Sequence, residues 1–253
     1  FTQDIPDAGS IGKYYKSGDY ISHSESSKGL INRLYLLVRK RTLGSKRKLV
    51  RRITGVTAGH LLDVGSGTGA FVHEMKAHGW QVTGLEPDAD AREAGKKLYG
   101  AELEDTSRLF GLVQGQYDAI SLWHVLEHVH DLHGYMEQLK KLLKDTGRLF
   151  IAVPNYTSFD AAVYKENWAA WDVPRHLYHF SPGSMRQLVD KHGMKLLHGQ
   201  PMWFDSFYVS MLSSRYKNGK TNYPAAAWYG LRSNLRAIGH PTRCSSVIYI
   251  IGK

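Results

Sequence analysis

The residues best suited to chemistry begin with a glycine-rich stretch at residues 61–69, which reads LLDVGSGTG. An apolar run ends in the carboxylate of Asp63, and glycine then alternates with small residues before a helical pattern begins. Glycine allows a positive φ and lets a ligand approach the main chain without meeting a Cβ atom. Unpaired N–H groups at the start of the helix then face that ligand. The pattern predicts a buried strand, a tight turn and a helix N-terminus around a nucleotide-like ligand.

A second carboxylate follows at the end of the next apolar segment. Residues 81–85 lead to Glu86, roughly where α/β nucleotide sites place an acid for ribose hydroxyls. A dinucleotide-type G-x-G-x-x-G loop needs glycine at position 70, but Ala70 stands there. The G-x-G-x-G loop after Asp63-Val64, together with Glu86-Pro87-Asp88, resembles the first two motifs of the class I S-adenosylmethionine-dependent methyltransferases.

This resemblance implies a cofactor and a set of residues that bind it. The cofactor is S-adenosyl-L-methionine, and an N-terminal arm is expected to close over it as a lid. The alternative is that the tyrosines of this arm only anchor it to the domain surface. Trp123 and Leu122 end the fourth strand and precede a Leu-Glu-His-Val segment that passes beside the cofactor in related small-molecule enzymes. The residues expected to bind the cofactor are Tyr14, Tyr20, His23, Asp63, Gly65, Ser66, Gly67, Gly69, Glu86, Pro87, Leu103, Leu122 and Trp123.

A loop rich in aromatic and basic residues, 168–181, is the candidate substrate wall. Pro174 disfavours helix at the residue before it, and loops beyond the carboxyl ends of strands line the ligand pocket. The segment resembles the His-Leu-x-x-Phe-Ser segment of families grouped with the ubiquinone-biosynthesis O-methyltransferases. An alternative is that its histidines only tie the loop down through hydrogen bonds. The residues expected to contact substrate are Trp168, Trp171, Arg175 and His179.

Two histidines are candidates for a catalytic base. His124 directly follows the fourth strand, and His176 lies in the loop after the fifth. An imidazole with an unperturbed pKa near 6.5 is available in its neutral form at pH 7. We hypothesise that one of them deprotonates the acceptor, and we favour His176 because Trp171 and Arg175 stand beside it.

A metal site is the alternative use of the histidines after the fourth strand. His124, Glu127 and His128 are spaced i, i+3, i+4 and share one face if the segment is helical. Two imidazoles and a carboxylate can bind a divalent ion. The Glu-His pair of the wider family is structural, however, so we expect no metal.

Alternating apolar and helical segments predict an α/β fold. The resemblance implies a Rossmann-like, mostly parallel sheet of seven strands in the order 3-2-1-4-5-7-6, with helices on both faces. Strand 3 is expected near residues 100–103, Gly44-Ser45 is expected to divide a basic helical segment, and Gly147 is expected to end a helix at about 131–144. We divide the chain into a basic N-terminal arm and cap, 1–54, and a methyltransferase domain, 55–253. A helical insertion is expected at about 203–243, before the last strand.

The basic charge lies in the flanks of the chain. The formal net charge is +10, and residues 1–60 carry 12 lysines and arginines against 4 acids. Residues 200–253 carry 7 against 1, while the middle is mildly acidic. Such flanks attract anionic substrates, lipid headgroups or nucleic acid, or form a solvated surface. One cysteine excludes a disulfide framework. No membrane span or signal peptide is recognised, so we expect a cytoplasmic protein.

The sequence favours methyl transfer to an oxygen or nitrogen of a small molecule or glycan precursor. The small-molecule partner can be anionic, because the flanks are basic. Two alternatives stay open: a nucleic-acid or lipid methyltransferase that uses the basic flanks, and a non-catalytic S-adenosylmethionine-binding module. Nucleic acid is the less expected partner, a membrane surface is possible but not favoured, and the oligomeric state is open.

Overall fold

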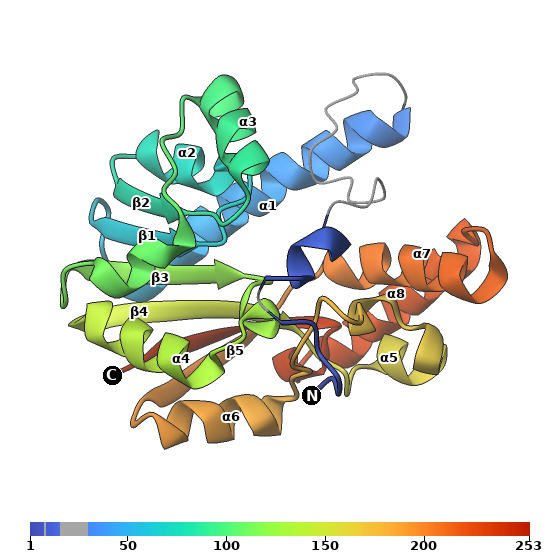
Figure 1. Ribbon diagram of the computed structural model, residues 1–253. Coiled ribbons are helices and arrows are strands. Elements are labelled where there is room, and N and C mark those ends of the chain that lie inside the picture. Colours follow the sequence, from blue (N-terminus) through green and yellow to red (C-terminus); the bar gives the residue numbers. More distant parts are fainter. Residues whose placement is uncertain (8, 16–29) are drawn as a thin grey trace. The chain divides into compact units, whose positions relative to one another are not determined.

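The structure is a computed structural model that describes residues 1–7, 9–15 and 30–253, with the backbone alone for 30–36 (Figure 1). Internal contacts divide the chain into two units. The glycine unit comprises Lys16–Trp123, His133–Phe150 and Gly252–Lys253, and the histidine unit comprises Phe1–Tyr15, His124–Leu132 and Ile151–Ile251. This division does not follow the predicted boundary at residue 54.

The strands form a mixed sheet in the order β2-β1-β3-β4-β6-β5. Strand β1 pairs in parallel with β2 and β3, with Leu62 opposite Thr83 on one side and Ile120 on the other. Both β1 and β3 are almost wholly buried, as expected for parallel strands covered on both faces. The strands are β1 His60–Val64, β2 Gln81–Leu85, β3 Tyr117–Trp123, β4 Leu143–Pro154, β5 Lys195–Pro201 and β6 Ser246–Gly252.

The predicted count of seven strands is wrong, because the described sheet has six. The missing strand is the one expected near residues 100–103. A single parallel bridge between Leu85 and Glu104 stands in its place at the edge beside β2. The other strands keep the expected order once this edge strand is removed. The rest of that segment forms no ladder with β2.

Most of the expected helices form, including both helices of the predicted insertion, α7 and α8. Helix α6 begins with a capping box, in which Ser181 accepts from the backbone of Ser184 and Ser184 accepts in return. The short helix α5 is a feature that the sequence patterns did not predict. The helices are α1 Leu30–Thr54, α2 Ala70–Lys76, α3 Ala89–Tyr99, α4 Leu132–Leu142, α5 Phe159–Tyr164, α6 Pro182–Lys191, α7 Asp205–Asn218 and α8 Tyr223–Ala237.

Two glycines do not end helices as expected. Helix α1 runs unbroken through Gly44-Ser45, since an interior glycine costs a helix only about 1 kcal/mol relative to alanine. Gly147 lies within β4, where the side chain of Leu143 and the carbonyl of Tyr117 leave no space for a Cβ atom. Tertiary packing overrides the local signal at both positions.

Helix α1 packs on its own unit. Leu49 and Val50 are buried, and Arg47 Nε donates to Glu74 Oε1 of α2 at 2.7 Å. Across the residues that the structure describes, none of the helices combines the length and the hydrophobicity needed to cross a bilayer.

Candidate functional site: a glycine loop and a histidine cluster

The glycine loop has the backbone shape that its sequence predicts. Gly65, Gly67 and Gly69 have φ values of 71°, 55° and 75°, in the left-handed region that favours glycine. The N–H groups of Gly65 and Ser66 both donate to the carbonyl of Leu85, at 2.7 and 2.9 Å. These bonds fasten the turn to the end of β2, so the loop is held open before helix α2 begins.

Glu86 lies beside the loop with its carboxylate fixed by main-chain donors. Its Oε2 accepts from the Gly67 N–H at 2.7 Å and its Oε1 from the Asp88 N–H at 3.0 Å. Burial raises the pKa of Glu86, and these two bonds oppose that effect. A carboxylate has about four acceptor sites, so two stay available for a pair of ligand hydroxyls. A Cβ atom built on Gly67 meets no atom within 4 Å, which leaves its main chain open to a ligand.

Asp63 is buried beneath the loop, where Ser121 Oγ donates to its Oδ1 at 2.6 Å. Burial raises the pKa of Asp63 to about 6, although Ser121 and the charge of Lys46 on α1 oppose the rise. The Ser66 hydroxyl donates to the carbonyl of Asp63 at 2.8 Å and braces the turn. The sequence patterns did not single out Ser121 or Lys46.

Trp123 belongs to the same unit as the loop, and its ring is held between two side chains. Phe71 meets it edge-on at 5.6 Å between ring centroids, and Lys46 Nζ lies 4.2 Å from its centroid. The neighbouring Leu122 side chain is fully buried in the core. Its expected place beside the cofactor stays a prediction, and any contact would come from its main chain.

Leu103 supports the loop by packing. A Cβ atom added at Gly84 would lie 2.5 Å from a Leu103 methyl, and one added at Gly95 would lie 2.7 Å from the Thr68 carbonyl. Glycine at these two positions lets β2 and α3 approach the loop closely. Neither glycine was singled out, because their spacing follows no loop motif.

Of the arm residues expected to bind the cofactor, the structure describes Tyr14 alone. Tyr14 ends a 3-10 helix of the histidine unit, with Lys13 Nζ over its ring at 5.1 Å. Tyr20 and His23 lie outside the described residues. Pro87 is exposed directly after Glu86, and its carbonyl accepts from Arg92.

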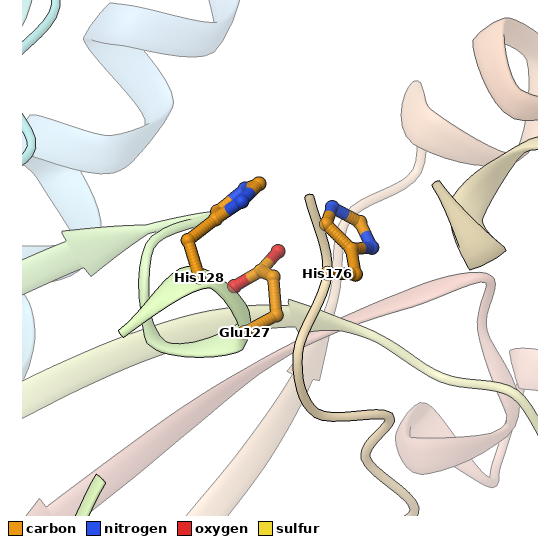
Figure 2. Close-up of side chains that lie close together, drawn as sticks. All are labelled: Glu127, His128 and His176. Carbon is orange, nitrogen blue, oxygen red and sulfur yellow. The ribbon is translucent and has the colours of Figure 1, made fainter. Parts of the chain in front are cut away.

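The histidine unit brings Glu127, His128 and His176 together, as Figure 2 shows. One ligand atom from each lies within 4.8 Å of the others. His128 Nδ1 lies 3.0 Å from the Arg175 carbonyl, and His176 Nδ1 lies 2.8 Å from the Ala170 carbonyl. Because a carbonyl only accepts, each Nδ1 carries a proton, and in a neutral ring the Nε2 atom then keeps its lone pair.

Glu127 completes this cluster with a buried carboxylate. Its Oε2 has no hydrogen-bond partner among the described residues. A carboxylate and two imidazoles can coordinate a first-row divalent ion, and carbonyl bonds to the far nitrogens are usual behind such ligands. His176 thus takes the place that the spacing had given to His124. The expectation of no metal stays a prediction.

His124 is instead tied to two carboxylates. Its Nε2 lies 2.8 Å from Asp205 Oδ2 and its Nδ1 lies 3.3 Å from Glu127 Oε1. Burial alone would lower the pKa of His124, but the hydrogen bonds and charges of Asp205 and Glu127 outweigh it and raise that pKa to about 10. Both nitrogens then carry protons at pH 7. In this arrangement His124 cannot accept another proton, so its candidacy as the base is not supported.

His176 differs from His124 in its protonation state. Burial lowers the pKa of His176 to about 4, so the ring is neutral at pH 7. It also lines a small recess of about 170 Å³ within the histidine unit. This volume includes open solvent and leaves no room for a water-sized sphere, so a substrate enters the recess only if it widens. The lining residues are Pro154, Tyr156, Trp168, Ala170, His176, Tyr178, His179 and Phe180.

The expected substrate residues lie on or near this recess but differ in exposure. Trp168 is almost fully buried, and its Nε1 donates to the buried Asp160 at 2.8 Å. Trp171 is half-buried and contacts Trp168 and His179 edge-on, with ring centroids 5.3 and 5.0 Å apart. Arg175 pairs with Asp172. Trp168 is thus mainly a core residue. Trp171 and His179 are only partly buried and contact each other edge-on.

The first residues of the chain lie against the same loop. The Thr2 hydroxyl donates to the His176 carbonyl at 2.6 Å and lies 3.1 Å from His179 Nε2. The Tyr15 hydroxyl lies 2.9 Å from His128 Nδ1. These contacts join segments more than a hundred residues apart, and for this reason no spacing in the sequence indicates them.

A family model described as a methyltransferase domain matches residues 37–198, which is well over half of the chain. The match includes the glycine loop, Glu86 and the histidine cluster, and it ends before α7 and α8.

Curated relatives share modest identity. A ubiquinone biosynthesis O-methyltransferase of Xanthomonas oryzae pv. oryzae is 29% identical over 130 residues, 47% of this chain and 54% of the relative. The chain thus spans about half the length of that relative. An enzyme of the same name from Erwinia tasmaniensis is 26% identical over 185 residues, 67% of this chain and 73% of the relative.

A solved structure shares the fold. The 1,6-didemethyltoxoflavin-N1-methyltransferase of Burkholderia thailandensis has a TM-score of 0.53 and 14% identity, covering 83% of this chain and 77% of that one. That structure holds 1,6-didemethyltoxoflavin and S-adenosylhomocysteine. Likeness at this identity establishes a Rossmann-like α/β fold, as expected from the sequence.

Proposed function

The chain belongs to the family of methyltransferase domains, and on this premise we propose that it transfers the methyl group of S-adenosylmethionine to a small molecule. The acceptor atom is an oxygen or a nitrogen, on a molecule such as a phenol, an amine or a glycan precursor. The observation that carries the proposal is the open main chain of Gly67 beside the buried carboxylate of Glu86.

The glycine unit provides the cofactor site. The loop from Gly65 to Gly69 would hold the methionyl part, and the two free acceptor sites of Glu86 would take the ribose hydroxyls. Lys46 and Asp63 add one cationic and one acidic group near the loop. When bound, S-adenosylmethionine supplies an electrophilic methyl group. The chain's own task is then to bind the acceptor and align it for displacement.

The histidine unit provides the proton acceptor. An acceptor hydroxyl must lose its proton as the new bond to carbon forms, and the neutral Nε2 of His176 can take it. Its Nδ1–H stays bonded to the Ala170 carbonyl, which fixes the ring. The negative Glu127 carboxylate nearby would stabilise the imidazolium that results. Trp171, Arg175 and His179 are the proposed substrate contacts on the same loop, with Trp168 behind them.

Calorimetry with two glycine variants tests the cofactor site. Gly67→Val places a side chain where the ligand would lie, and it also strains a backbone at φ +55°. Gly100→Val is the matched control, because Gly100 has φ +60° and equally open surroundings at the end of α3. We expect S-adenosylmethionine to bind the wild type and the Gly100 variant, and to fail to bind the Gly67 variant. Tight binding of NAD with no binding of S-adenosylmethionine would overturn the proposal.

Turnover on a panel of hydroxyl and amine acceptors, followed by release of S-adenosylhomocysteine, tests the reaction. Cofactor binding without turnover on any acceptor would favour the alternative of a non-catalytic module. Salt-dependent binding and methylation of nucleic acid would favour the other alternative.

A further inference from the structure

On helix α8 the distribution of residues is the reverse of that on an ordinary surface helix. Its buried face carries small or polar residues, Ala226, Gly230, Ser233, Asn234 and Ala237. Its exposed face carries large apolar ones. Trp228, Leu231, Leu235 and the following Ile238 are 56%, 44%, 54% and 65% exposed. Their spacing of three, four and three residues places them along one stripe.

The packing against α7 explains why the small residues face inward. A Cβ atom on Gly230 would lie 2.7 Å from the Phe207 ring and 3.0 Å from the Phe207 Cα, so the two helices touch closely (Figure 1). Ser206 Oγ donates to Asn234 Oδ1 at 2.7 Å, and Ser233 Oγ donates to Asp160 Oδ1 at 2.6 Å. Small and polar groups therefore occupy much of the buried face of α8. The side chains of its apolar stripe stay about half exposed.

The charged residues of the chain after Asp205 have one sign. Asp205 is the last acidic residue of the chain, and seven lysines and arginines follow it. Two of them, Arg232 and Arg236, lie on the exposed side of α8. Arg236 Cζ lies 4.3 Å from the ring centroid of Phe159, and Arg232 Cζ lies 5.6 Å from that of Trp228. An exposed apolar stripe flanked by arginines is the composition of an interfacial helix.

We propose that the outward face of α8, formed by Trp228, Leu231, Leu235 and Ile238 with Arg232 and Arg236, docks on an anionic lipid bilayer. The arginines meet headgroup phosphates while the apolar stripe enters the boundary with the acyl chains. This inference does not rest on the proposed reaction. It concerns a part of the chain beyond the family match, which ends at residue 198.

Charge and chemistry favour a bilayer over other occupants. A second copy docked by a two-fold axis would bring Arg232 and Arg236 close to the same residues of its partner, and α8 offers no acid to pair with them. Nucleic acid would satisfy the arginines but gives Leu231 and Leu235 no apolar phase to enter. A bilayer surface offers phosphates to the arginines and an apolar phase to the leucines.

Vesicle co-sedimentation tests the proposal with full-length protein. Vesicles of phosphatidylcholine containing about a third phosphatidylglycerol are compared with pure phosphatidylcholine at low and at physiological salt. We expect the wild type to sediment with the anionic vesicles and to stay largely in solution with the neutral ones. The Leu231→Gln/Leu235→Gln variant should lose at least about tenfold in partitioning, since two apolar side chains no longer enter the interface.

Two matched controls distinguish binding through this face from nonspecific adsorption to vesicles. Leu98→Gln/Val113→Gln removes two apolar side chains of the glycine unit that are 44% and 69% exposed, and it should partition as the wild type does. Arg232→Gln/Arg236→Gln should lose roughly tenfold at low salt, whereas Lys76→Gln/Lys96→Gln, on exposed positions of α2 and α3, should change little. Thermal melts establish that each variant is folded.

Three results would overturn the proposal. The first is wild-type protein that stays in solution with both kinds of vesicle. The second is equal partitioning of the Leu231/Leu235 variant and its Leu98/Val113 control. The third is a wild-type dimer in light scattering that the Leu231/Leu235 variant abolishes, without lipid binding, because the face would then join two copies of the chain.

Discussion

The two units offer ligands different kinds of surface. The glycine unit presents main chain: three left-handed glycines, and a carboxylate held by the N–H groups of Gly67 and Asp88. The histidine unit presents side chains brought together from separate segments, with Glu127, His128 and His176 at their centre. The first site depends on backbone shape and the second on protonation state. Substitutions in the glycine unit should therefore change cofactor affinity, whereas substitutions in the histidine unit should change turnover.

The largest effect is expected at His176. His176→Ala should lower turnover by a factor on the order of 10²–10⁴, because a positioned base is lost, while the cofactor Kd stays as in the wild type. Since the pKa of His176 is lowered to about 4, wild-type turnover should stay flat with respect to this group from about pH 6 to pH 9. Wild-type turnover in the alanine variant over that range would show that positioning alone suffices.

The next largest effect is expected at Glu86. Glu86→Ala removes the proposed partners of two ribose hydroxyls and should weaken S-adenosylmethionine binding roughly 100-fold, as charge-assisted hydrogen bonds are lost. Calorimetry gives the Kd, and Glu102→Ala at an exposed position nearby is the control. An unchanged Kd would show that Glu86 does not bind the cofactor, and the glycine unit would then not be the cofactor site that distinguishes it from the histidine unit.

A smaller effect is expected from the N-terminal arm. Deleting residues 1–27 removes the contacts of Thr2 with His176 and His179, and that of Tyr15 with His128. Turnover should fall several-fold while the melting temperature changes little, because the core strands do not include the arm. Full activity of the truncated chain would contradict a role for Tyr14, Tyr20 and His23 in closing over the ligands.

The smallest effect is a pH dependence of stability from His124. Its pKa is about 10 in the folded chain against 6.5 unfolded, so its stabilisation is complete below pH 6.5 and lost as the pH rises through 10. Asp205→Asn should remove about 1 kcal/mol of unfolding free energy at pH 7, a small value because the His124 side chain is 33% exposed. Urea melts at pH 6 and at about pH 10 should therefore converge for wild type and variant only at the higher pH. Parallel curves at every pH would contradict the ion pair.

The glycine loop and its carboxylate could be predicted because they depend on residue types that lie close together in the sequence. Glycine at 65, 67 and 69 and an acid at 86 are written in consecutive segments, and their backbone angles follow from residue type. The contacts of the histidines in the histidine unit could not be predicted in the same way. The partner of His124 lies 81 residues away, and the neutral state of His176 depends on burial that no spacing reveals.

The errors in the fold have a similar cause. The segment near residues 100–103 looked like a strand, but only one bridge forms there. Gly44 looked like a helix stop, but its local cost is small compared with the packing of the remaining helix. Local propensity was outweighed by tertiary contacts at both places.

The close packing of Leu103 under the glycine loop has a consequence for sequence drift. A Cβ atom at Gly84 would lie 2.5 Å from one of its methyl groups and one at Gly95 would lie 3.3 Å from the other, whereas one at Gly69 would meet the leucine at an ordinary 3.4 Å. Gly84 and Leu103 therefore form an epistatic set with Val72, whose Cγ2 would lie 2.9 Å from the same new atom, and an alanine at 84 becomes tolerable only after both neighbours have given way. We expect the order in which such changes accumulate to be constrained, so that along any lineage the leucine shrinks before the glycine grows.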